Sequence, residues 1–236
     1  MAMAGLQQLA LPVPAGIVFS TPTALGATRF VAFGDSITSG IQSTYDGRML
    51  YDGLPGAYPE RLELGLNYYH APQRFTVINR GLGAEAVSIG GVNRIRATLD
   101  IDRPQALLLL EGINDLGGGI SIPNTVAALQ RVIDISLQKN IPVLIATMFQ
   151  TYETTNPNTG VERDNAAGLV PEFNRQIRQI AARQNVTLVD IEAAFGGNRS
   201  LLGGDGLHPT PEGYDRMAGE FLRAIQRAFP VRGSFQ

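Results

Sequence analysis

The chain lacks cysteine and is poor in other side chains that carry particular kinds of chemistry. Its 236 residues include no cysteine, one lysine and two histidines, which are Lys139, His70 and His208. Without cysteine the chain has no thiolate nucleophile, no internal disulfide and no cysteine-ligated metal. Lys139 lies outside any glycine-rich loop, which argues against a Walker motif, and two histidines cannot form a three-histidine zinc site. We therefore predict chemistry that needs no metal and no organic cofactor.

Charge of either sign is also sparse. The formal net charge is −2, and no run of basic residues is interleaved with aromatics, which argues against nucleic acid as a partner. Residues 1–28 carry no charged side chain and contain Pro12, Pro14 and Pro22, so we expect an uncharged extension and no membrane span. This segment lacks the basic start of a signal peptide. The sequence leaves both export to the periplasm or exterior and a cytoplasmic location open, and does not determine the oligomeric state.

Strand and helix patterns alternate over residues 29–236, which we predict to form one domain. Short apolar runs typical of buried strands occur at 29–33, 75–78, 106–110, 141–147 and 186–189. Two segments between them, within 126–137 and 173–180, repeat apolar residues with a helical period. A last helix should begin with Thr210 as its N-cap and Pro211 as its first residue. This alternation predicts a three-layer α/β/α sandwich with a flavodoxin-like, five-stranded parallel sheet of order 2-1-3-4-5.

Polar loops follow the first three predicted strands. Ser36 follows the first strand, Ala84 the second and Asn114 the third. In the predicted strand order their loops meet beyond the carboxyl ends of the strands, where ligands of open α/β sheets bind. Ser36 should open a helix, where backbone N–H groups favour developing negative charge. Asn114 can donate its side-chain amide to an oxyanion, whereas we expect Asp115 and Glu111 to hold the loop.

A serine hydroxyl needs a base before it can act as a nucleophile, and histidine is the side chain best matched to that task. His70 has no carboxylate within several residues, so we interpret it as a packing or surface residue. His208 follows Asp205 by three positions across Gly206, so a tight loop can bring the carboxylate against the imidazole. We therefore take His208 as the candidate base and Asp205 as the residue that orients it.

Four short motifs stand in one order along the chain. They are Gly34-Asp35-Ser36, Asn79 to Ala84, Gly112-Ile113-Asn114-Asp115 and Asp205-Gly206-Leu207-His208-Pro209. From about Arg29 to the last helix, this set resembles the SGNH (GDSL-type) hydrolase superfamily of serine esterases and lipases. The serine motif is not Gly-x-Ser-x-Gly, which argues against the nucleophile elbow of α/β-hydrolases. The resemblance implies a carboxylic ester hydrolase.

The resemblance also implies a role for each motif. Ser36, His208 and Asp205 would form a catalytic triad, and the Ser36 N–H, the Ala84 N–H and the Asn114 amide would form the oxyanion hole. SGNH enzymes usually have glycine five positions after the asparagine of the second motif, where this chain has Ala84. We expect Ala84 to donate from an ordinary backbone conformation, or Gly83 to take its place after a one-residue shift.

Two long connections, 41–73 and 149–168, leave carboxyl ends of strands and should wall the pocket. The residues that we predict to bind substrate are Asp35, Tyr45, Tyr51, Phe149 and Tyr152. Neither connection has a long apolar stripe, which a deep acyl channel would need because each buried methylene contributes roughly 0.8 kcal/mol. We therefore predict short acyl groups, from acetyl to butyryl, on a small-molecule or glycan-linked ester.

Two alternatives belong to other functional classes. The segment Gly81 to Ala86 matches the dinucleotide fingerprint Gly-x-Gly-x-x-Ala, with Asp100 or Asp102 at the expected distance along the chain. Against this alternative, both acids lie in a predicted turn and Gly90-Gly91 interrupts the helix that the pyrophosphate would need. The second alternative is a non-catalytic binding module on the same fold.

Overall fold

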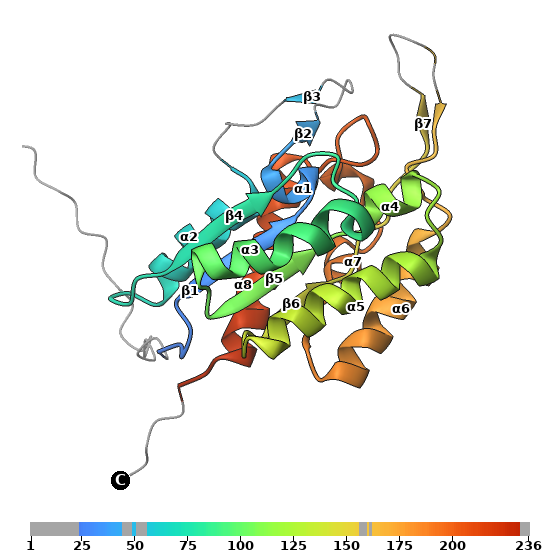
Figure 1. The fold of residues 1–236 in the computed structure, drawn as a ribbon. Coiled ribbons are helices and arrows are strands. Elements are labelled where there is room, and N and C mark those ends of the chain that lie inside the picture. Colours follow the sequence, from blue (N-terminus) through green and yellow to red (C-terminus); the bar gives the residue numbers. More distant parts are fainter. Residues whose placement is uncertain (1–23, 44–48, 51–55, 156–159, 161, 232–236) are drawn as a thin grey trace, which may run out of the picture.

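The computed structural model describes residues 24–43, 49–50, 56–155, 160 and 162–231. Its centre is a sheet of five parallel strands in the order β4-β1-β5-β6-β9 (Figure 1). In chain order these strands are β1 (Arg29–Gly34), β4 (Thr76–Gly81), β5 (Ala106–Leu110), β6 (Val143–Ala146) and β9 (Thr187–Val189). They are the five strands predicted from the sequence, and their order in the sheet confirms the predicted 2-1-3-4-5 topology.

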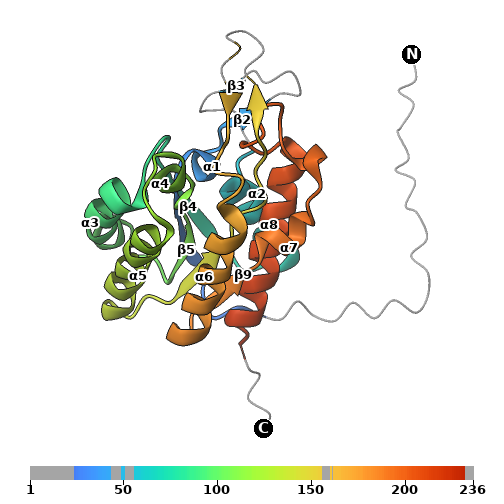
Figure 2. The same ribbon diagram turned by 90° about the vertical axis from the view of Figure 1, so that its right-hand side faces the viewer.

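Helices cover both faces of the sheet (Figure 2). On one face, α2 (Tyr58–Tyr69) packs against α8 (Pro211–Ala228). The other face carries α3 (Val92–Asp102), α5 (Ile122–Gln138) and α6 (Val170–Gln184). As predicted, α8 begins at its N-cap Thr210, whose hydroxyl accepts a hydrogen bond from the Gly213 N–H at 3.3 Å. The predicted three-layer sandwich is therefore confirmed.

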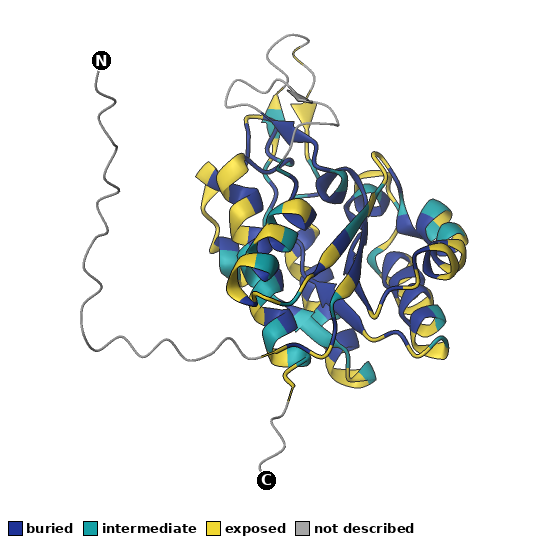
Figure 3. Cartoon of the chain, turned by 90° about the vertical axis from the view of Figure 1, so that its left-hand side faces the viewer, coloured by how far each residue is buried: buried dark blue, intermediate teal, exposed yellow. Residues whose placement is uncertain are grey.

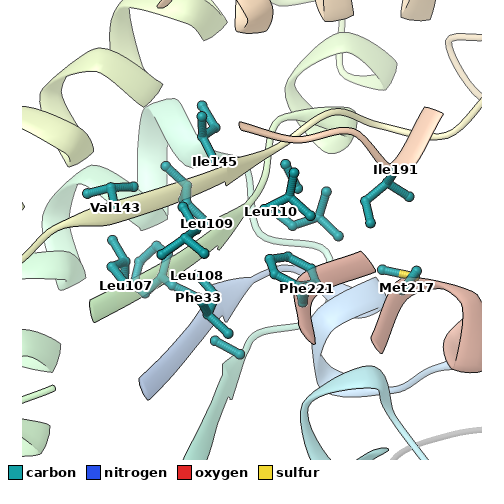
Figure 4. Packing of buried hydrophobic residues seen from close by; sticks show 14 of the residues in the cluster. Phe33, Leu107, Leu108, Leu109, Leu110, Val143, Ile145, Ile191, Met217 and Phe221 are labelled. Atoms are coloured by element: carbon teal, nitrogen blue, oxygen red, sulfur yellow. The ribbon is translucent and has the colours of Figure 1, made fainter. Parts of the chain in front are cut away.

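The core lies in the two seams between the sheet and its helix layers. Strand β5, with the sequence Ala-Leu-Leu-Leu-Leu, is buried along its whole length because helices cover both of its faces. Figure 3 shows the central strands as buried, with exposed residues on the outer sides of the helices and along the edge strand β4. In Figure 4, Phe221 and Met217 of α8 lie on one side of the central strands, whereas Phe33 packs against Arg94 of α3 on the other side. This packing makes the sheet a rigid support for the loops at its ends.

The carboxyl ends of the strands carry short elements instead of long helices. The first three are α1 (Ser36–Ser39), the π-helix Val87–Gly91 and α4 (Ile113–Gly117). Beyond β9 come α7 (Ile191–Phe195) and the 3-10 helix Arg199–Leu201. Two small antiparallel hairpins rise from the same end as α1 and α4, namely β2 (Gln42–Ser43) with β3 (Met49–Leu50) and β7 (Thr154–Thr155) with β8 (Glu162–Arg163) (Figures 1 and 2).

The first segment described, residues 24–28, packs onto the domain. Leu25 and Ala27 are buried members of the core, and Leu25 forms a bridge with Pro230 near the other end of the chain. The predicted extension at 1–28 therefore includes residues that belong to the folded unit, and residues 1–23 lie outside those described. Among the helices of the described chain, none combines the length and apolarity that a bilayer span requires.

Helix α1 sits directly on the ends of two strands because both strands end in glycine. A Cβ at Gly81 would lie 2.0 Å from the backbone nitrogen of Ser39, and one at Gly34 would lie 2.0 Å from Oγ1 of Thr38. Distances this short leave no room for any side chain at these two positions. The two glycines therefore let the short helix that begins with Ser36 lie against the edge of the sheet.

Candidate active site

Ser36 is the first residue of α1 and follows β1 after a single intervening residue. That residue, Asp35, is the N-cap of α1, and its Oδ1 accepts a hydrogen bond from the Ile37 N–H at 2.9 Å. Asp35 is only 1% exposed, so its predicted contact with substrate is wrong and its side chain stabilises the turn instead. Burial raises the pKa of Asp35 to about 6, although the hydrogen bond from Ile37 acts in the opposite direction.

The structure brings the three predicted triad residues into one hydrogen-bonded line. His208 Nε2 lies 2.9 Å from Ser36 Oγ, and His208 Nδ1 lies 2.6 Å from Asp205 Oδ2. All three residues are buried, with 6% of Ser36 and 5% of each partner exposed. An imidazole that donates from Nδ1 to a carboxylate has Nε2 free to accept a proton from the serine. This arrangement is the one needed to activate a serine hydroxyl.

A tight loop sets the carboxylate against the imidazole. Asp205 Oδ1 accepts the backbone N–H groups of Leu207 and His208 at 3.2 and 3.0 Å, which leaves Oδ2 for the ring. Gly206 between them has φ +69°, and a Cβ there would lie 2.4 Å from the carbonyl oxygen of Tyr152. Only glycine fits both constraints.

Burial would raise the pKa of Asp205, but hydrogen bonds from the His208 ring and from backbone N–H groups, together with the charge of His208, hold that pKa below its ordinary value. Two neighbours also fix the main chain of Asp205. The amide of Asn165 and the hydroxyl of Thr154 both donate to its carbonyl oxygen, at 2.7 and 3.0 Å. The second long connection therefore holds the loop that carries Asp205.

Asn114 stands at the start of α4, next to the loop that follows β4. Its Nδ2 donates to the carbonyl oxygen of Glu85 at 2.9 Å, which uses one of the two amide hydrogens and fixes the direction of the other. Asp115 is completely buried and accepts the N–H groups of Val87 and Ser88 at 2.7 and 3.0 Å. It holds the loop, as predicted. The segments that follow β4 and β5 are thus tied together by two side chains of one motif.

Ala84 adopts a left-handed backbone conformation, which glycine adopts more readily than alanine. Its φ is +60°, and it lies in a turn closed by the Glu85 N–H and the Leu82 carbonyl at 3.1 Å. The expectation of an ordinary conformation is therefore wrong, because the turn imposes a left-handed residue at this position. An alanine can adopt this geometry at a cost of roughly 1–2 kcal/mol. Its N–H is retained.

An open pocket of about 520 Å³ lies beside the site. Its walls come from α4, from the strand β8 and the residues after it, and from the loop that precedes His208. The lining residues are Ile113, Asn114, Gly117, Glu162, Arg163, Asp164, Asn165 and Leu207. Most of this wall is polar or charged, and the second long connection contributes half of it, as predicted.

Other predicted substrate contacts are placed elsewhere. Phe149 is completely buried and stacks on Phe195 with ring centroids 4.7 Å apart, so its assignment to the pocket wall is wrong. The Tyr152 hydroxyl donates to the Gly197 carbonyl at 2.8 Å, and its ring lies under the Arg199 guanidinium at 4.0 Å. These contacts hold a loop and do not face the pocket. Tyr45 and Tyr51 lie outside the described residues.

The remaining candidates of the sequence analysis have structural partners. His70 is buried, with its ring 5.8 Å from that of Phe75, as expected for a packing residue. Asp102 lies inside α3 and forms two hydrogen bonds of 2.7 Å with Arg80, and Asp100 pairs with Lys139. Neither acid ends a strand, as a dinucleotide site would require. In the described part of the chain, no group of three or more histidine or carboxylate side chains is arranged to hold a metal ion.

Comparison with known proteins agrees with this geometry. A family model described as GDSL-like lipase/acylhydrolase matches residues 32–216. A multidomain esterase of Ruminococcus flavefaciens is 27% identical over 128 residues, which are 52% of this chain and only 16% of that protein. The aryl esterase of M. smegmatis superposes with a TM-score of 0.72 at 17% identity, over 85% of this chain and 99% of that chain. A carbohydrate acetylesterase from Sinorhizobium meliloti superposes with a TM-score of 0.68 at 15% identity, over 86% and 100%.

The two structural likenesses confirm the fold, and the family model covers most of the chain, including all four motifs and the start of α8. The predicted resemblance is therefore confirmed, and the chain belongs to the GDSL-like lipase/acylhydrolase family.

Proposed function

We propose that this protein is a serine hydrolase that cleaves carboxylic esters with short acyl groups through an acyl-enzyme on Ser36. The observation that carries this proposal is the 2.9 Å approach of His208 Nε2 to Ser36 Oγ, with Asp205 on the far side of the ring. Membership of the lipase/acylhydrolase family supports ester hydrolysis, and the names of the esterase relatives point in the same direction.

In this mechanism His208 acts first as a base and then as an acid. Nε2 takes the hydroxyl proton of Ser36 while Oγ attacks the ester carbonyl, and Asp205 stabilises the resulting imidazolium. Nε2 then gives the proton to the departing alcohol, which leaves the acyl group on Ser36. A water molecule attacks this acyl-enzyme by the same exchange of protons and releases the acid.

Negative charge on the former carbonyl oxygen needs donors that are in place before the reaction. The candidates are the N–H groups of Ser36 and Ala84 and the second amide hydrogen of Asn114. The hydrogen bond to Glu85 orients the Asn114 amide in advance, so no reorganisation is required when charge develops. Ala84 has the left-handed conformation that glycine favours, whereas Gly83 does not have a positive φ, which supports Ala84 over Gly83 as the counterpart of the usual glycine.

The substrate preference rests on the character of the pocket wall. Ile113 and Leu207 are its only large apolar members among the described residues, and the remainder are one glycine, two asparagines and three charged residues. Each methylene of a long acyl chain would gain roughly 0.8 kcal/mol only if apolar surface covered it. A polar wall suits a small acyl group and the hydroxyl groups of a polar alcohol, and the small-molecule or glycan-linked ester predicted from the sequence fits this description.

Replacing Ser36 by alanine should abolish ester hydrolysis and covalent labelling by a serine-directed phosphonate, because every other group of the site acts through that hydroxyl. Labelled peptides of the unmodified chain, identified by mass spectrometry, should contain Ser36. As a matched control, Ser200→Ala removes a hydroxyl from the exposed 3-10 helix and should change neither result. Labelling that maps to another serine contradicts the triad, and a folded chain without hydrolysis or labelling indicates a binding module.

Asn114→Ala should lower kcat by roughly 10²–10³ with little change in KM, because an oxyanion donor acts mainly in the transition state. Ala84→Gly keeps the N–H and the left-handed turn, so it should keep kcat close to that of the unmodified enzyme. Steady-state kinetics on one soluble ester measures both variants. A folded Asn114→Ala protein with unchanged kcat would show that the residue only forms the turn.

Nitrophenyl esters of increasing chain length test the acyl preference. Below the micellar concentration, kcat/KM should be highest between acetate and butyrate and should fall for longer chains, because only two large apolar side chains line the described pocket and could cover such a chain. A steady rise toward the longest soluble chain would overturn the preference for short acyl groups without affecting the triad.

A further inference from the structure

A cluster of buried ionisable groups lies next to Ser36 and includes Asp35, the residue directly before it. It consists of Asp35, Glu85, Arg94 and Glu111, which come from the loops after β1, β4 and β5 and from α3. The three carboxyl groups are between 1% and 6% exposed as residues, and one arginine accompanies them. Three buried negative charges beside one positive charge would be very unfavourable, so protons must be retained within the cluster.

Glu85 is the carboxylate that pairs with the arginine. Arg94 Nε lies 2.7 Å from both Glu85 oxygens, and Arg94 Nη2 also bonds Glu85. The same guanidinium donates to the Gly34 carbonyl at 3.0 Å and covers the Phe33 ring at 3.7 Å. The guanidinium of Arg94 thus bonds both oxygens of one carboxyl group, that of Glu85.

Glu111 has a different environment. Its side chain is 0% exposed, and it lies 4.0 Å from Arg94 Nη2, beyond hydrogen-bond distance. In the described part of the chain, neither of its oxygens has a hydrogen-bond donor. The carboxyl groups of Glu85 and Glu111 are neighbours, because both lie at Nη2 of Arg94 and only Glu85 bonds it. A buried carboxylate without a donor is costly, whereas a carboxylic acid at this place can donate to the adjacent carboxylate.

We propose that Glu111 is a protonated positioning residue, whose carboxylic acid donates a hydrogen bond to Glu85 and thereby fixes the turn that faces Asn114. Glu85 connects Glu111 to Asn114, because its side chain binds Arg94 next to Glu111 while its carbonyl oxygen accepts from the Asn114 amide at 2.9 Å. This inference rests on the proposed function, since it assigns to the Glu111 proton the task of orienting a donor for the oxyanion.

The surroundings of Glu111 favour its neutral form. Burial is the largest cause, and the negative charges of Asp35 and Glu85 add to it, so the pKa of Glu111 is raised well above its ordinary value although the Arg94 charge lowers it. Tyr58, on α2, also faces the carboxyls of Asp35 and Glu111, and its buried phenol carries no charge that could compete. The charges of His208 and Asp115 act on Asp35 as well.

The proton has a measurable effect on stability. A carboxyl whose pKa is raised on folding holds a proton that the unfolded chain releases above its ordinary value of 4.5. Its contribution to stability is therefore complete at pH values below about 4.5 and is lost as the pH rises through the raised pKa of the folded state. If Glu111 were ionised and stabilised by Arg94, the same contribution would grow as the pH rises over the acid range.

The test compares Glu111→Gln and Glu111→Met with the unmodified full-length chain. Glutamine has the shape of the protonated acid and can still donate to Glu85, so kcat should stay within about threefold. Methionine fills the space but cannot donate, so kcat should fall at least about tenfold while KM stays nearly constant, as expected when an oxyanion donor is misplaced. Glu172→Gln, an exchange on the exposed face of α6, serves as the control and should leave kinetics unchanged.

Two readouts do not depend on catalysis. The infrared band of a protonated carboxyl should be present at neutral pH in the unmodified protein and weaker in Glu111→Gln by one group. The free energy of unfolding, measured by denaturant titration, should increase in Glu111→Gln relative to that of the unmodified protein as the pH rises above about 4.5. An unchanged infrared band, a stability difference of the opposite sign, or a kcat that falls as far in Glu111→Gln as in Glu111→Met overturns the proposal.

These results separate the two claims. If the unmodified protein hydrolyses no ester while the infrared and stability measurements agree with a protonated Glu111, the proposed function fails and the proton assignment stands. If hydrolysis is normal and those measurements disagree, only the role of Glu111 fails. If Glu111→Met does not fold, the comparison of Glu111→Gln with the unmodified protein still decides the assignment.

Discussion

The contact between Ser36 and His208 joins residues that are 172 positions apart in the chain, and the rest of the fold is needed to hold them 2.9 Å from each other. The serine is held by the end of β1 and the first turn of α1, whereas the histidine is held by the loop before α8. Both loops rest on the same closely packed sheet, in which the central strand is buried on both faces. The accuracy of one hydrogen bond therefore depends on packing over the whole domain.

Polar groups behind the site are as well organised as those that face the pocket. Asp35 caps the helix that begins with Ser36, Asp115 holds the loop after β4, and Glu85 orients the Asn114 amide. Arg94 connects this loop to the end of β1. Such partners hold candidate oxyanion donors in place before substrate binds, which is the condition for electrostatic stabilisation of a transition state. Asp35 is itself buried among these groups, and this burial raises its pKa.

The sequence carried enough information for the sheet and for the contact between Asp205 and His208, because both rest on local signals. Apolar runs mark the five strands, and the spacing of Asp205 and His208 fits one tight loop. The prediction was wrong for Phe149, because its position after a strand resembles a loop while its burial depends on Phe195, far along the chain. The conformation of Ala84 could not be read from the residue itself, since the turn around it imposes the positive φ. The pairing of Glu85 with Arg94 has no pattern in sequence, because an intervening π-helix sets it.

The central claim is that acyl transfer passes through a covalent intermediate on Ser36. Rapid quenching during turnover of nitrophenyl acetate, followed by mass spectrometry of the protein, tests it most directly. We expect a burst of nitrophenol before the steady state and a protein mass increased by one acetyl group, with the added mass on the peptide that contains Ser36. Steady hydrolysis with an acetyl group on a different residue would contradict the account.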